Sequence, residues 1–174
     1  MEVKVLEEQE MNHTLKDNEE NVDRGPNGLG GWLILVAIGL VITPIILIFT
    51  ITEYNLPVFN DAEIWDTFTD PNSAYYLPLF SLLAYFELIG NIIILLCSLL
   101  FLYLFFTKKK LFPKIYYWFL IVNLVFILID ELLTNSMFVF EEFAFSETLR
   151  QAFTCAIWLP YLKVSKRVRN TFVK

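Results

Sequence analysis

Five polar side chains lie within otherwise apolar stretches of this 174-residue chain and form its candidate site. They are Glu87, Asn91, Asn123, Asp130 and Arg150. Ionisable groups at membrane depth are costly to bury, so they usually bind a proton, an ion, a ligand or one another. A planar guanidinium can also join carboxylates from two helices at once. The sequence therefore predicts an intramembrane polar cluster, provided that its helices bring these residues together.

This polar cluster has two interpretations. With a helical rise of about 1.5 Å per residue, Glu87, Asp130 and Arg150 fall in the outer third of the bilayer, as does Glu131. We expect Arg150 to pair with Glu87 there, in a cluster that orients the helices. The other interpretation is a site for a proton, a cation or a small polar ligand. The partly wetted position near the membrane surface favours the first interpretation.

Four stretches of the chain would have to position these side chains. A helix needs about 20 mostly apolar residues to cross a hydrocarbon core about 30 Å thick. Residues 31–51, 77–106 and 111–133 satisfy this plainly, whereas residues 149–164 are fewer and more polar and could lie on the membrane surface. We favour a fourth span, because it gives the polar groups of the other helices a partner. The prediction is an all-α, multi-pass bundle of four transmembrane helices.

Lysine and arginine predict the orientation of this bundle. Of the 13 basic residues, 12 lie before the first stretch, around the junction of the second and third, or from the end of the fourth onward. The links 52–76 and 134–148 contain none, and Arg150 stands at the start of the fourth stretch. Short loops rich in lysine and arginine remain in the cytoplasm. Both termini are therefore predicted to be cytoplasmic.

Two charged tails flank the predicted transmembrane domain of residues 30–164. Residues 1–29 hold eight acids and three basic residues, without an aromatic side chain, which predicts a mostly disordered acidic tail. Residues 165–174 form a basic cytoplasmic tail. Its Lys166, Arg167 and Arg169 accompany apolar residues at helical spacing, so we expect a helix on the inner membrane surface, attracted to anionic lipid.

Several classes of function are disfavoured by composition. The net charge of −6 gives no basic footprint for nucleic acid. The single histidine, His13, lies in the acidic tail, and the two cysteines lie far apart in apolar stretches, so neither a metal site nor a histidine-based catalytic site is expected. No serine-centred elbow or phosphate loop occurs. We therefore expect no enzyme, no catalytic residue and no cofactor.

Three short motifs resemble a known family. The segments "GGWL" at 30–33, "FP" at 112–113 and "AIWLPYLKVSKRVRNTF" at 156–172 resemble the YdgK-like bacterial inner-membrane family. The resemblance covers about residues 28–173 and leaves the acidic tail outside. It implies a four-helix integral protein of the bacterial inner membrane, in a family whose domain has no known function. It carries over no catalytic residue.

Two hypotheses of function follow from these features. In the first, the protein is a structural or accessory subunit that acts through helix–helix contacts in the lipid bilayer, with copies of itself or in a larger membrane complex. The alternative is a small transporter-like or ion- or proton-responsive protein that uses Glu87, Asp130 and Arg150. Four short spans enclose little volume, so a conduction path would need an oligomer.

Overall fold

The computed structural model describes residue 11 and the ranges 27–137 and 145–174, and within them it is all-helical, without strands. The predicted disorder of the acidic tail falls almost entirely on residues outside these ranges. The helices in chain order are α2 (Trp32–Thr50), the π-helical turn η1 (Ile51–Asn55), α3 (Leu56–Asn60), α4 (Ala62–Thr69), α5 (Phe80–Phe106), α6 (Leu111–Met137), α7 (Ser146–Val164) and α8 (Lys166–Thr171).

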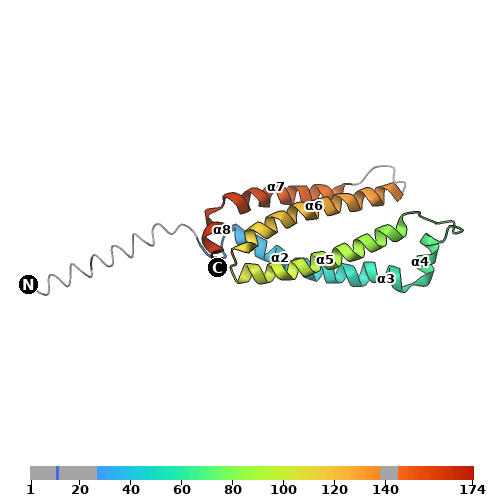
Figure 1. Cartoon of the computed structure of the whole chain (residues 1–174), viewed down its shortest axis with the longest axis horizontal. Helices are drawn as coiled ribbons and strands as arrows, with labels where there is room; N and C mark the ends of the chain where they lie inside the picture. The colour runs from blue at the N-terminus through green and yellow to red at the C-terminus, as the bar shows by residue number, and fades with distance from the viewer. Residues whose placement is uncertain (1–10, 12–26, 138–144) are drawn as a thin grey trace, which may run out of the picture.

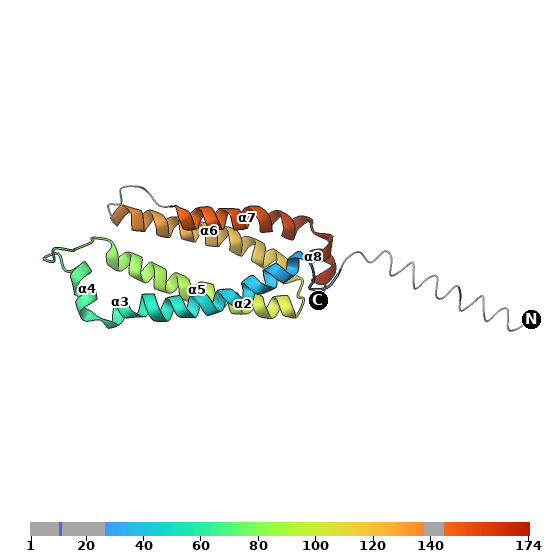
Figure 2. The same cartoon turned by 180° about the vertical axis from the view of Figure 1, so that it is seen from behind.

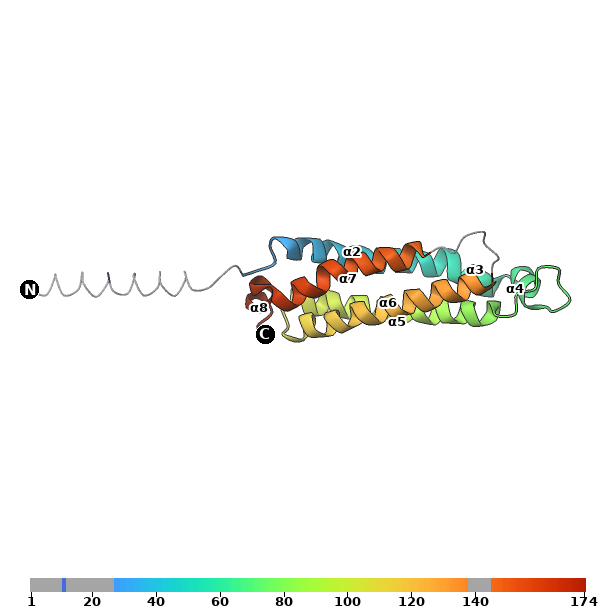
Figure 3. The same ribbon diagram turned by 90° about the horizontal axis from the view of Figure 1, so that it is seen from above.

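The long helices α2, α5, α6 and α7 run side by side in alternating directions (Figures 1 and 2). Consecutive helices are neighbours: α2 packs against α5, α5 against α6, and α6 against α7. Viewed from above, α7 lies along α6 (Figure 3). We call the two ends of the bundle the α8 end and the α4 end. The start of α2 and the C-terminus both lie at the α8 end (Figure 1).

Three helical segments of the described chain are long and apolar enough to cross a membrane: Trp32–Asn60, Phe80–Phe106 and Leu111–Met137. The first is longer than the predicted stretch of 31–51, because η1 and α3 continue α2 without a break to Asn60. Helix α7 is not among the three. It has polar side chains such as Arg150 and Thr154 among its apolar ones, which lowers its mean hydropathy.

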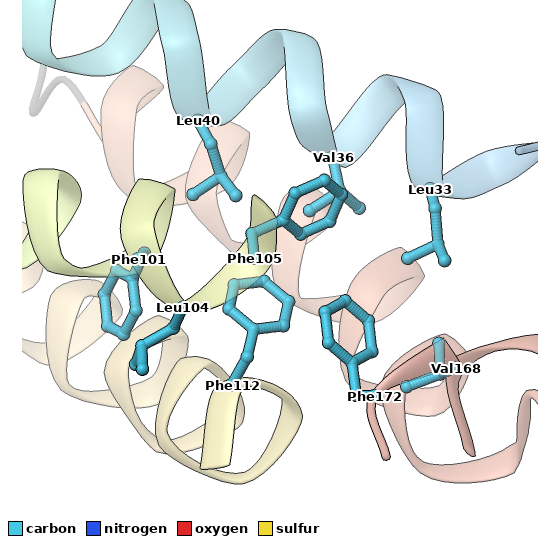
Figure 4. Close-up of a cluster of buried hydrophobic side chains, with 9 residues drawn as sticks. All are labelled: Leu33, Val36, Leu40, Phe101, Leu104, Phe105, Phe112, Val168 and Phe172. Atoms are coloured by element: carbon cyan, nitrogen blue, oxygen red, sulfur yellow. The ribbon is translucent and has the colours of Figure 1, made fainter. Parts of the chain in front are cut away.

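The main hydrophobic core lies at the α8 end (Figure 4). Its buried side chains come from α2, α5, α6 and the C-terminal tail: Leu33, Val36, Leu40, Phe101, Leu104, Phe105, Phe112, Val168 and Phe172. Phe112 stacks on Phe172 with ring centroids 4.8 Å apart. Dense aromatic packing of this kind is a large source of burial energy, so it fixes the α8 end firmly.

The C-terminal tail forms the predicted helix, but its apolar side faces the protein. Val168 and Phe172 are only 1% and 4% exposed, so they are not available to a membrane surface as expected. Both fill the core between α2 and the start of α6 (Figure 4). The sequence pattern located the apolar stripe of this helix. It did not reveal whether the stripe packs against protein or against lipid. Lys166 and Arg169 remain exposed.

The motifs that suggested a family resemblance meet at this end. Thr171 Oγ1 donates a hydrogen bond of 3.2 Å to the carbonyl of Gly28. A Cβ atom at Gly30 would lie 2.5 Å from Nη1 of Arg167, so glycine leaves the space in which the guanidinium rests. Gly31 has a φ of 59°, a conformation that favours glycine. The glycines at 30 and 31 therefore allow α8 to dock beside the start of α2.

Candidate functional site

The candidate site is centred on Asn55, which joins two of the predicted residues. Asn55 Nδ2 donates a hydrogen bond of 3.3 Å to Glu87 Oε2. Asn91 Nδ2 in turn donates one of 2.9 Å to Asn55 Oδ1. Glu87 and Asn91 lie four residues apart on α5, so both reach the same side of that helix. The result is a ladder of polar side chains between η1 and α5, which we call the Asn55 ladder (Asn55, Glu87 and Asn91).

Asn55 was missed by the sequence reasoning, which ended the first span at residue 51. A signal was nevertheless present. The buried residues of α2 include Val36, Leu40 and Pro44, at helical spacing. Eleven residues are close to three full turns, so Asn55 continues the face of Pro44. At 5% exposure it is one of the few buried polar side chains of the described chain.

Asp130 approaches the Asn55 ladder from α6, but no hydrogen bond between described residues joins it to the ladder. Its carboxylate interacts electrostatically with that of Glu87. Within the described ranges, Asp130 Oδ1 is a buried oxygen without a hydrogen-bond partner. Such an atom loses its hydration without compensation, so its position is energetically unfavourable. The structure thus brings Glu87, Asn91 and Asp130 to one region of the bundle.

Glu131 holds the start of α7. Its Oε1 accepts a hydrogen bond of 2.8 Å from the backbone N–H of Glu147, and its Oε2 accepts one of 3.1 Å from that of Thr148. These N–H groups belong to the first turn of α7, whose N-cap residue, Phe145, supplies no side-chain cap. A carboxylate at this place satisfies free N–H groups and opposes the positive end of the helix dipole. Glu131 therefore has a structural task as an interhelical cap.

Arg150 does not form the predicted pair with Glu87. Its guanidinium instead pairs with Glu147, one turn earlier on the same helix. The Arg150 side chain is 77% exposed, so it points away from the interior of the bundle. Depth along the helix axis was compatible with the expected pair, but the rotation of α7 turns Arg150 away from it. The predicted pairing is wrong, and Arg150 is not part of the cluster.

Asn123 is also separate from the Asn55 ladder. It lines a groove of about 400 Å³ between α5 and α6, whose other walls are mainly apolar. Gly90 and Phe126 face each other in this groove, and Phe126 stacks on Phe86 with ring centroids 4.7 Å apart. Among the residues that the structure describes, Asn123 has no hydrogen-bond partner for its amide. Polar side chains of membrane helices commonly hydrogen-bond across helices.

Comparison with known proteins identifies the family. Residues 26–173 match DUF2569, which is described as a protein of unknown function. The chain belongs to the DUF2569 family. No curated protein and no solved structure matched the chain. The family description carries no activity, so conclusions about function rest on the residues themselves.

The polar residues of the candidate site in this DUF2569 domain mostly hydrogen-bond to other groups of the protein. Asn55 bonds both members of the Asn55 ladder on α5, and the Glu131 carboxylate is occupied by α7. In the described part of the chain, no three His, Cys, Asp or Glu side chains are grouped so that they could hold a metal ion. Chemically, the arrangement can join helices through amide–carboxylate bonds. Among the described residues, Asp130 Oδ1, Thr148 Oγ1 and the amide of Asn123 have no hydrogen-bond partner.

Proposed function

We propose that this DUF2569 protein is a four-span integral protein of the bacterial inner membrane that acts as a structural or accessory subunit and not as an enzyme. The lysine and arginine pattern supports a cytoplasmic position for both termini. The fourth span is α7, which lies along α6 and returns the chain to the α8 end. The YdgK-like resemblance supports the same arrangement and the same membrane.

The observation that carries this proposal is the position of Asn123. It lies in a groove whose walls are mainly apolar and which opens between two helices that can each span a membrane. An amide that faces hydrocarbon finds no hydrogen bond there, whereas an amide that meets another helix gains about 1 kcal/mol. The exposed apolar surface beside Asn123 is formed by Ile89, Ile93 and Val122, which a partner helix can cover. The partner is a second copy or a helix of a larger membrane complex.

The test compares the association of two groove variants. Asn123→Leu removes the amide and keeps the bulk, whereas Val122→Leu changes a neighbouring apolar side chain as a matched control. Cross-linking in intact membranes, followed by mass measurement in mild detergent, reports the bound partner. We expect Asn123→Leu to lose the partner band and Val122→Leu to keep it. A strictly monomeric wild type, or equal association of both variants, contradicts the proposal.

The second candidate function, a transporter-like or ion-responsive protein, is favoured by Asp130 alone. Its Oδ1 is buried without a partner and lies in the electrostatic range of Glu87, as expected for a group that binds a proton or cation. The thermal stability of purified protein should then rise with one added cation, and Asp130→Asn should abolish that rise. Asn55→Ala serves as the control that disturbs the region but keeps both carboxylates. No dependence on any cation eliminates this candidate.

A further inference from the structure

A pocket of about 390 Å³ opens between α6 and α7 at the α8 end. Its lining consists of Pro113, Lys114, Tyr117, Trp118, Leu162 and Lys163. The two lysines come from different helices and are both exposed. This pocket shares no residue with the Asn55 ladder or with the groove that contains Asn123.

The charge around this pocket is of one sign. Neither Lys114 nor Lys163 has an acidic partner among the described residues. The segments that build this end of the bundle, 28–50, 91–129 and 150–174, contain no aspartate or glutamate at all. Two ammonium groups on one pocket, without an internal counter-ion, attract an anionic group from outside.

The other walls of the pocket are suited to a ligand that is partly apolar. The Trp118 side chain is 60% exposed and stands beside Tyr117, on the turn of α6 that follows the lysine-rich link. Tryptophan and tyrosine prefer the level of lipid headgroups, where one end of the ring is apolar and the other wet. Pro113 and Leu162 add apolar surface at the same place. A phosphate between lysines, with hydrocarbon continuing along the helices, fits these walls.

We propose that this pocket binds the headgroup of an anionic phospholipid, with Lys114 and Lys163 on its phosphate and Trp118 against its glycerol and upper acyl chain. Basic pockets between transmembrane helices on the cytoplasmic side recognise such headgroups. The pocket differs from the exposed basic tail, since Lys166 and Arg169 attract any anionic surface without a shape to select a headgroup. Binding of the acidic segment 1–26 to the same lysines is the alternative that the experiment tests.

The experiment titrates purified full-length protein in mild detergent with phosphatidylglycerol or phosphatidylcholine and counts bound lipid by native mass spectrometry. The variant Lys114→Gln/Lys163→Gln is compared with Lys109→Gln/Lys174→Gln, which removes the same charge at the same end but outside the pocket. At the usual contribution of a basic residue near anionic lipid, the pocket variant should bind phosphatidylglycerol roughly 25-fold more weakly. The control variant should bind it nearly as well as the wild type.

Four outcomes overturn this proposal. Equal loss in both double variants means that the attraction is diffuse charge, and equal binding of the two lipids means that the net negative charge of the headgroup is not selected. Displacement of the lipid by glycerol phosphate points to a soluble ligand. The last comparison uses a full-length variant in which the eight acids of residues 1–26 are replaced by their amides. If only that variant binds phosphatidylglycerol, the acidic segment is the occupant of the pocket.

Discussion

The amide of Asn91 on α5 donates a hydrogen bond of 2.9 Å to Asn55 Oδ1, and so ties α5 to the π-helical turn that extends α2. The same Asn55 donates its own amide to Glu87. Because Asn55 is buried, little water competes for these bonds, and each partner depends on it. Asn55 thus makes both hydrogen bonds that join η1 to α5 in the Asn55 ladder.

Replacing Asn55 should therefore destabilise the bundle more than replacing either partner. Asn55→Leu removes both bonds and leaves Glu87 and Asn91 without their amide partner, at an expected cost of about 1–2 kcal/mol in free energy of unfolding. Asn91→Ala loses one bond and should cost about half as much. Reversible unfolding in detergent micelles measures both. The exposed Asn60→Leu is the control, and equal effects of Asn55→Leu and Asn60→Leu contradict the bridging role.

Gly90 should not tolerate a larger residue. A Cβ at this position would overlap the Phe126 ring, which is held in place by its stacking on Phe86. Gly90→Ala should lower the unfolding free energy by about 1–3 kcal/mol, despite the better helix propensity of alanine. Gly39→Ala is the matched control, because nothing lies within 4 Å of its added Cβ.

Whether Phe126 is the side chain that restricts position 90 can be tested directly. Phe126→Leu shortens the side chain that Gly90→Ala would meet, so the double variant should recover part of the loss in thermal stability. Effects of contacting residues are not additive, and this coupling measures the contact. If the double variant loses the plain sum of the two single changes, Phe126 does not restrict position 90.

The cap on α7 should depend on a carboxylate at position 131. Glu131→Ala frees two first-turn N–H groups and should cost about 0.5–2 kcal/mol, whereas Glu131→Gln keeps an acceptor oxygen and should cost less. Glu147→Gln breaks only the exposed ion pair with Arg150 and should change stability by less than about 1 kcal/mol. Thermal unfolding of the three variants in one detergent compares them. An equal effect of Glu131→Ala and Glu147→Gln would rule out the cap.

The hydropathy pattern was sufficient to locate α2, α5 and α6. A spanning helix must be apolar over about 20 residues whichever way it faces, so its position can be found without knowing its neighbours. The end of the first helix was misplaced because η1 and α3 contain polar residues such as Asn55. The Asn55 side chain is satisfied within the protein, which the local sequence does not reveal.

The arrangement of side chains around each helix was harder to predict. Arg150 and Glu87 were assigned to a similar depth, but a hydrogen bond also requires that both helices turn these residues toward each other. Glu147 lies one turn from Arg150 on the same helix, so their ion pair does not depend on how two helices are rotated. The stripe of Val168 and Phe172 was equally ambiguous, since lipid and a protein core both accept apolar side chains. Sequence periodicity identifies a face, and packing decides what covers it.

The membrane topology gives the last prediction, and it depends on whether α7 crosses. Single cysteines at Asn60, Lys109 and Lys166 are introduced into a chain in which Cys97 and Cys155 are replaced by alanine. Lys109 and Lys166 should react from the cytoplasmic side and Asn60 from the outer side, as measured with an impermeant thiol reagent on intact and opened cells. The backbone N–H of Lys174 bonds the carbonyl of Lys108 at 3.2 Å, so the C-terminal tail and the link before α6 must share one side.

This labelling separates three spans from four. If α7 lay on the outer surface and only three helices crossed, Lys166 would react from the same side as Asn60. That result would also require the contact between Lys174 and Lys108 to be absent in the membrane. Ser146→Cys, at the start of α7, is the control for the opposite end of the bundle. Like Asn60→Cys, it should react with the thiol reagent from outside. Reaction of Asn60 and Lys109 from one side would instead overturn the orientation derived from the basic residues.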